Sequence, residues 1–158
     1  MSPHDFSIAL RVRHPSIDPA EVTDRLGIDP QHAWRAGESR HADGDAAGSA
    51  VHRETYWVGL LPAPRLFGPA PWDQRVEESL RQAVALPQAS LYFTLLKMKR
   101  SASFWREFAD QGGTVECLLQ VHKADRFQLD LSQALLLALV DLRITLSIEV
   151  EGALRAAA

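Results

Sequence analysis

Three histidines lie in one polar segment of the sequence, and by residue type they could bind a metal ion. They are His32, His41 and His52, with carboxylates between them. Imidazole and carboxylate groups are ligands of zinc and iron, so a metal-dependent hydrolase is one functional hypothesis. The separations are irregular and lack the i, i+4 spacing that places two histidines on one helix face. The sequence therefore favours no metal and no cofactor, and the hydrolase is the weakest of three hypotheses.

The same segment holds candidate residues for a small anionic ligand. These are Trp34, Arg35, Gly37, Glu38 and Arg53. A guanidinium fork binds carboxylate or phosphate, a tryptophan offers an aromatic plate, and a glycine allows close approach. The structural alternative is that the tryptophan and an Arg–Glu pair anchor the segment to the body of the protein. Both interpretations remain open at this stage.

The sequence contains no recognisable nucleophile or nucleotide motif. Cys117 is the only cysteine and falls at an inward position of an expected strand. No serine lies in a G-x-S-x-G turn, and neither a P-loop nor a G-x-G-x-x-G run occurs. We therefore predict no catalytic residues, and a protein that is not an enzyme is favoured over an enzyme.

Alternation of apolar and polar residues predicts four strands, over residues 7–13, 55–61, 114–122 and 143–150. The inward side chains would be Ile8, Leu10, Val12, Val115, Cys117, Leu119, Val121, Ile144, Leu146, Ile148 and Val150. The outer face would show Arg11, Arg13, Glu116, Gln120, Thr145, Ser147 and Glu149. A mixed-charge face of this kind is usually solvated, and otherwise serves as a dimer or partner surface.

Helices are predicted between these strands. Asp18 caps the first, which ends at Gly27. Helical spacing returns over residues 72–86, and residues 88–99 favour a helix although a strand also fits. Ser101 is the expected cap of a further helix that stops at Gly112. The helix at 131–142, opened by Asp130, is nearly all apolar and should be buried on several sides.

The order β-α-β, helices, β-α-β predicts an α+β fold. We expect a ferredoxin-like, four-stranded, mainly antiparallel sheet with helices packed on one face. Residues 1–158 should form a single domain. The polar stretch 29–53 has no periodicity and is predicted to be a loop, mobile at about 40–50, and the tail at about 152–158 should be loosely ordered.

Several short motifs resemble one bacterial family. They read Ile17-Asp18-Pro19-Ala20-Glu21-Val22, Leu26-Gly27-Ile28-Asp29-Pro30, Trp34-Arg35-Ala36-Gly37-Glu38 and then Trp57. Together with Gly112-Gly113 before a strand, they are similar to domain of unknown function 4279 over most of the chain. The stretches 44–49 and 62–71 depart from the compact pattern of that family. The resemblance implies no established activity.

The charge and composition of the chain limit the classes of partner and the cellular location that we expect. The net charge of −3 and the isoelectric point near 6.0 provide no basic field, which argues against nucleic acid. No apolar run approaches the ~20 residues of a membrane span, and the charged N-terminus does not resemble a signal peptide. With one cysteine, we expect a cytoplasmic protein. The leading hypothesis is a non-catalytic protein-interaction or regulatory domain, immunity-like, that binds a protein partner or itself.

Overall fold

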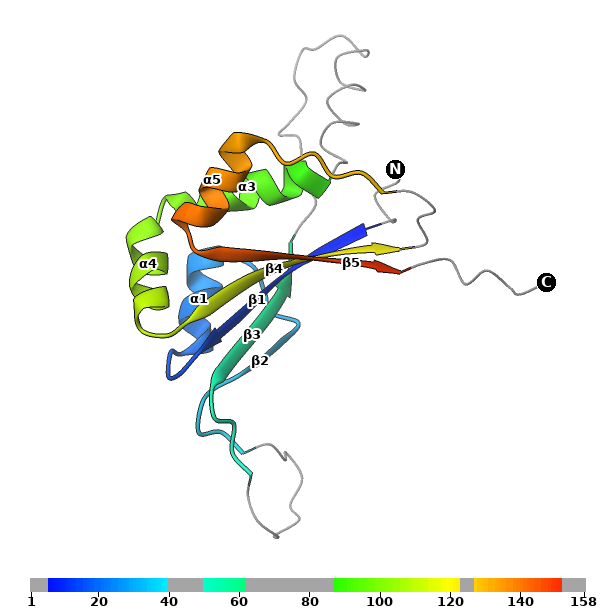
Figure 1. Cartoon of the computed structure of the whole chain (residues 1–158). Coiled ribbons are helices and arrows are strands. Elements are labelled where there is room, and N and C mark those ends of the chain that lie inside the picture. The colour runs from blue at the N-terminus through cyan, green and yellow to red at the C-terminus, as the bar shows by residue number, and fades with distance from the viewer. Residues whose placement is uncertain (1–5, 40–49, 62–86, 123–126, 152–158) are drawn as a thin grey trace, which may run out of the picture.

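The computed structural model describes residues 6–39, 50–61, 87–122 and 127–151. Within these ranges, one five-stranded mixed sheet carries four helices gathered on one side of it (Figure 1). The strands are β1 (Phe6–His14), β2 (His32–Trp34), β3 (Thr55–Leu60), β4 (Thr114–His122) and β5 (Ile144–Glu151). The helices are α1 (Pro19–Leu26), α3 (Pro87–Lys99), α4 (Ala102–Asp110) and α5 (Gln133–Asp141). The predicted α+β class is confirmed.

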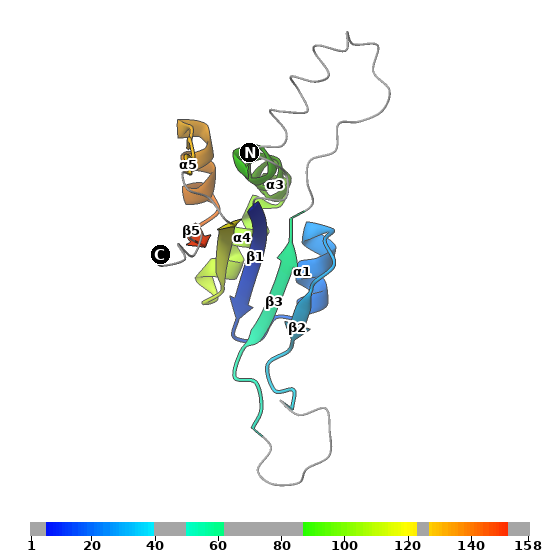
Figure 2. The same cartoon turned by 90° about the vertical axis from the view of Figure 1, so that its right-hand side faces the viewer.

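The strand order is β2-β3-β1-β4-β5. β1 pairs antiparallel with β3 and β4, and β2 pairs antiparallel with β3, so that β1, β3 and β2 lie side by side (Figure 2). β4 and β5 are parallel neighbours. The prediction of a four-stranded ferredoxin-like sheet is therefore wrong. β2 has only three residues, too few to show alternation, and α5 returns the chain so that β5 pairs parallel with β4 at the sheet edge.

The first helix begins and ends where the sequence predicts. Asp18 Oδ1 accepts a hydrogen bond from the Ala20 amide at 2.9 Å, and Pro19 occupies the first helical position. Gly27 closes the helix in the left-handed region, with φ of 62°. Val22 and Leu26 are the buried residues of this helix, which fixes its packed face against the sheet.

The ambiguous stretch 88–99 is helical, as favoured, within α3. Ser101 occupies the N-cap position of α4, as predicted, but its hydroxyl donates to the Met98 carbonyl at 3.3 Å and makes no capping bond. α4 ends before Gly112, whose φ of 90° suits glycine. Gly113 follows in contact with the Phe108 ring, which leaves no room for a side chain.

The polar stretch 29–53 is not one long loop. β2 pairs with β3, and Ser39 bridges Val51 beyond them. Residues 40–49, the tail from 152, the predicted helix at 72–86 and His41 lie outside the described residues. Among the helices that are described, none is long and apolar enough to cross a membrane.

Helix α5 and strand β5 are less buried than the sequence predicts. Ser132, not Asp130, caps α5, by accepting from the Leu135 amide at 3.2 Å. One face of α5 is buried, whereas Val140 on the other is 71% exposed. On β5, Ile144 is buried, but the far half of the strand runs past the helices (Figure 1) and its apolar side chains are open to solvent. The expectations that α5 is buried on several sides and that Ile148 and Val150 are covered by the core are therefore wrong, although both residues lie on the helix side of β5.

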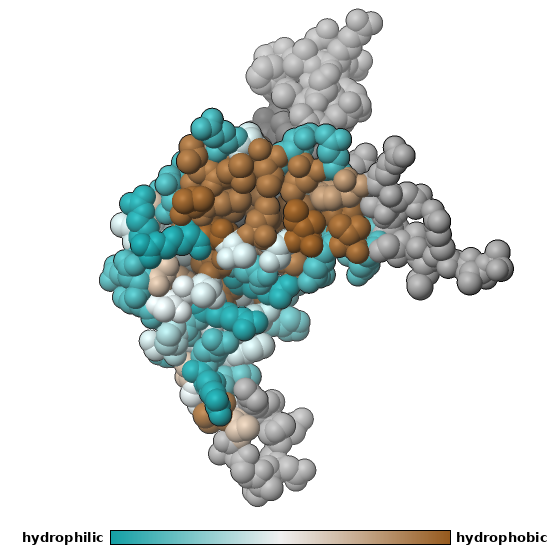
Figure 3. Space-filling view, in the orientation of Figure 1, coloured by the Kyte–Doolittle hydropathy of each residue, from teal (hydrophilic) through white to brown (hydrophobic). Residues whose placement is uncertain are grey.

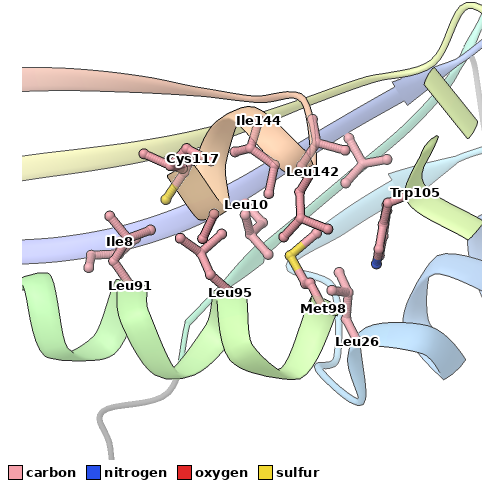
Figure 4. Packing of buried hydrophobic residues seen from close by; sticks show 14 of the residues in the cluster. Ile8, Leu10, Leu26, Leu91, Leu95, Met98, Trp105, Cys117, Leu142 and Ile144 are labelled. Atoms are coloured by element: carbon pink, nitrogen blue, oxygen red, sulfur yellow. The ribbon is translucent and has the colours of Figure 1, made fainter. Parts of the chain in front are cut away.

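The core lies between the helices and one face of the sheet. Ile8 and Leu10 from β1 meet Leu91 and Leu95 from α3, with Cys117 of β4 beside them (Figure 4). Further cluster members come from α1, α4, α5 and the start of β5. One continuous apolar cluster thus joins every described helix to the sheet, and it leaves the opposite sheet face for polar side chains.

Candidate functional site

The segment with the predicted site residues forms a hairpin that continues β2 and β3 beyond the sheet. The Gly37 amide donates to the His52 carbonyl at 2.8 Å, and the His52 amide donates to the Glu38 carbonyl at 2.9 Å. Gly37 has φ of 88°, a conformation that glycine adopts without strain. The hairpin is built by backbone pairing, so its side chains have defined neighbours.

Arg35 and Glu38 bind parts of the protein itself. The Arg35 guanidinium lies 3.2 Å from the Asp18 carboxylate, the same side chain that caps α1. The Glu38 carboxylate accepts from the Arg35 backbone amide at 2.8 Å. The Arg35 contact agrees with the anchoring alternative, although its partner is Asp18 and not a glutamate. The Glu38 contact lies within the hairpin itself. Arg53 is exposed and forms no ion pair with a described residue.

Trp34 stands in an aromatic stack on the sheet face away from the helices. Its ring lies 4.6 Å from the His52 ring and 4.4 Å from the Tyr56 ring, nearly parallel to both. The Arg13 guanidinium sits 5.7 Å from the centre of the Tyr56 ring. Trp34 pairs with Tyr56, and Tyr56 with Arg13, across adjacent strands. Sequence reasoning missed Tyr56 as the neighbour of Trp34 and Arg13 as the neighbour of Tyr56, because only the strand register reveals them.

The three candidate metal ligands do not form a described cluster. His32 is exposed on β2 opposite Val58, and His52 is engaged in the stack. His41 is outside the described residues. In the ranges that the structure covers, no three His, Cys, Asp or Glu residues come together in a metal-binding arrangement. The hydrolase hypothesis stays a prediction without geometric support.

Buried polar groups fasten the base of the hairpin to the loop before α1. The Thr55 hydroxyl donates to the Ile17 carbonyl at 2.7 Å and accepts from the Ala36 amide at 3.1 Å. Opposite Thr55 in the register, His14 Nδ1 accepts from the amides of Ser16 and Ile17 at 3.0 and 2.9 Å. Both side chains are buried, so these hydrogen bonds hold the loop and the hairpin against each other.

The polar face of the sheet is internally paired. Arg11 lies 3.6 Å from Glu116 and 3.8 Å from Glu149. The Ser147 hydroxyl donates to Glu116, and the Gln120 amide donates to Glu149 at 3.1 Å. The polar groups of this face therefore have partners within the chain.

The surface that lacks such pairing is apolar, and it covers the outer sides of α5 and α3 and the far half of β5. We call it the α5–β5 patch. Its exposed residues are Tyr92, Phe93, Leu96, Leu136, Leu137, Val140, Ile148 and Val150. Figure 3 shows an apolar area over α5 and the far half of β5, with polar residues below it. Isolated exposed apolar residues are ordinary, whereas joined areas of this kind are characteristic of contact surfaces in other proteins.

A pocket of about 370 Å³ opens at one margin of the patch, between the first turns of α3 and α5. Tyr92, Gln88 and Leu135 line it, together with Asp130 and Ser132. The pocket has a mainly apolar wall and borders Tyr92 of the patch.

The family model for a domain of unknown function (DUF4279) matches residues 4–152. The chain belongs to the DUF4279 family. The resemblance found in its short motifs is thereby confirmed. No curated protein and no solved structure matches this DUF4279 chain.

The thiol of the single cysteine in this DUF4279 chain is buried in a setting that makes it unreactive. Cys117 is fully buried, and burial, with a smaller contribution from Glu116, raises the pKa of its thiol to about 12. Nucleophilic cysteines instead have lowered pKa values, because the thiolate is the reactive form. Cys117 serves as a small apolar core residue.

Proposed function

We propose that this DUF4279 chain is a non-catalytic protein-interaction domain whose contact surface is the α5–β5 patch. The supporting observation is the joined exposure of apolar side chains on two adjacent elements, α5 and β5. Covering a half-exposed leucine or valine stabilises a complex by about 1 kcal/mol. Several such residues together provide the apolar centre that a protein interface needs.

Strand β5 adds a second means of binding. It is the last strand of the described sheet and pairs on one side only, with β4. The other side presents backbone N–H and C=O groups that another strand can pair with. An edge strand bordered by apolar helix surface therefore offers both backbone hydrogen bonds and side-chain burial to a partner.

The charged parts of the molecule support the same choice of surface. Arg11, Glu116 and Glu149 satisfy one another on the polar face, and Arg143 at the end of α5 pairs with Asp110 at 2.6 Å. Residues 133–140 of α5 carry no charge. The outer side of α5 is thus uncharged over these residues, so a partner needs apolar surface there rather than opposite charge.

A regulatory or immunity-like role in bacterial cytoplasm is the finer form of this proposal. A buried, unreactive thiol suits a reducing compartment, and it adds no catalytic group. Binding of a small anionic ligand by the hairpin remains an alternative prediction. Arg53 is the arginine of that set without an ion pair to a described residue, whereas Arg35 is paired with Asp18.

Photo-cross-linking in cells of the source organism tests the proposal. A photoreactive amino acid replaces Val140, which is 71% exposed in the patch, and a matched one replaces Val51, which is 46% exposed on the hairpin. We expect discrete protein adducts from position 140 and not from position 51. Adducts from neither position, or equal adducts from both, would contradict the proposal.

A further inference from the structure

We propose that the partner of the α5–β5 patch is a second copy of this chain, joined through antiparallel pairing of the two β5 strands. This inference rests on the proposed function and specifies its occupant. Two-fold symmetric dimers are the commonest oligomers, and such an axis presents the same strand to itself in antiparallel orientation. The result is a continuous sheet of ten strands, five from each described sheet.

The symmetry keeps the helices of both copies on the same side. A two-fold axis perpendicular to the sheet joins the helix-covered sheet face of one copy to the helix-covered face of the other. The two polar faces are joined in the same way. Since α5 precedes β5 and packs at that edge, the exposed side of α5 in one copy faces that of its partner. Leu137 and Val140 of each copy then lose contact with water together with the apolar side chains of β5.

The register of β5 is suited to pairing with itself. Residues directly opposite in antiparallel strands share a sheet face. With the two-fold axis at Ile148, that residue faces its own copy, and Leu146 faces Val150. All three lie on the helix side of the strand, where Ile148 is 44% exposed. The pairing therefore joins apolar side chains to apolar side chains.

Charge complementarity on the polar face supports this register. With the axis at Ile148, Glu149 lies opposite Ser147 and Glu151 opposite Thr145. No acidic residue meets another, whereas an axis at Glu149 would place that carboxylate against its own copy. Each glutamate also has a partner within its own chain. Glu149 is bound by Gln120 and Arg11, and Glu151 lies 3.1 Å from His122.

Molar mass in solution tests the dimer. The chain has a mass of 17.5 kDa, so sedimentation or light scattering at micromolar concentration should give twice that value. Ile148→Asp places a charge on the axis and should raise the dissociation constant at least about tenfold. Val51→Asp, at a similarly exposed apolar residue near the opposite sheet edge, should leave it unchanged. Circular dichroism of Ile148→Asp shows whether a monomer is still folded.

A disulfide cross-link tests the register. Cys117 is buried, so an Ile148→Cys variant carries one accessible thiol. Mild oxidation should link the two copies at this position rapidly, because directly opposed residues are within disulfide reach. The Val51→Cys variant should not cross-link in this way.

The proposal fails if the wild-type chain has the mass of one copy at 0.1 mM, or if Ile148→Asp leaves the dimer intact. Failure of oxidation to link Ile148→Cys copies would also overturn the register. A monomer that still gives adducts with other proteins from position 140 overturns the second copy as occupant but retains the protein-interaction function. A monomer without adducts overturns both, so the two failures are distinguishable.

Discussion

The indole of Trp57 lies against Gly59 on the core side of β3. A Cβ atom at Gly59 would stand 2.6 Å from Cη2 of Trp57 and 3.2 Å from Cγ2 of Ile28. Trp57 is fully buried, and its Nε1 donates to the Thr23 hydroxyl at 2.9 Å. The indole is therefore held by α1 and needs a neighbour without a side chain.

Gly59→Ala should lower the free energy of unfolding by about 1–3 kcal/mol, because the added methyl group forces Trp57 off its hydrogen bond. Urea denaturation measures this change. The same substitution is then made in a Trp57→Phe background, so that the cost of Gly59→Ala is measured both with tryptophan and with phenylalanine at position 57. The smaller ring leaves space, so the cost of Gly59→Ala should be smaller in that background. Equal costs in both backgrounds would show that the Trp57 contact is not the cause.

His14 should matter to stability far more than an exposed histidine. His14→Ala removes the acceptor of two part-buried hydrogen bonds from the Ser16 and Ile17 amides and should cost about 1–2 kcal/mol. Asn has a side-chain oxygen that accepts from amides two or three residues on, so His14→Asn should restore part of the loss. His32→Ala, at an exposed position, should change stability by no more than ~0.5 kcal/mol. Thermal or urea unfolding compares the three, and similar values for His14→Ala and His32→Ala would contradict the assigned role of His14.

Asp18 and Arg35 form one ion pair but should differ in importance. Arg35→Ala removes an exposed pair and should cost at most ~0.5 kcal/mol. Asp18→Ala removes the pair and also the cap of α1, which should cost about 1 kcal/mol. Asp18→Asn keeps a capping oxygen and should resemble Arg35→Ala. Equal effects of Asp18→Ala and Arg35→Ala in urea unfolding would argue against the capping role.

Cys117 should make the protein less stable at alkaline pH. The pKa of its thiol rises from 9.0 to about 12 in the fold. Between these values the unfolded chain loses the thiol proton and the folded chain keeps it, so the contribution to stability is complete below pH 9 and falls as pH rises toward 12. The stability difference between wild type and Cys117→Ala should therefore shrink across this window. A constant difference would contradict the raised pKa.

Local signals accounted for the elements that the sequence predicted correctly. Asp18 caps the start of α1 and Gly27 caps its end, as predicted, because helix capping depends only on neighbours within one turn. The alternation of β1 and β4 fixed which side chains enter the core, since both strands are covered by helices. These features need no knowledge of distant contacts.

The errors concern contacts between distant parts of the chain. β2 is defined by its pairing with β3, which the three residues from His32 to Trp34 do not reveal. Burial of Ile148 depends on where the helix layer ends, so alternation gave the correct face but the wrong environment. The candidate Arg35 was identified by type, yet its partner Asp18 lies 17 residues earlier. The apolar character of α5 was visible in the sequence, but its exposure was not.

The most direct test of the central claim is whether the α5–β5 patch is covered in the cell. Single-cysteine accessibility can be compared for Val140→Cys and Val51→Cys, with buried Cys117 as a silent background. In intact cells, a membrane-permeant thiol reagent should label Val140→Cys much more slowly than Val51→Cys, and after purification and dilution the two rates should converge. Equal labelling of both positions in cells would show that the patch is open to solvent and would contradict the account.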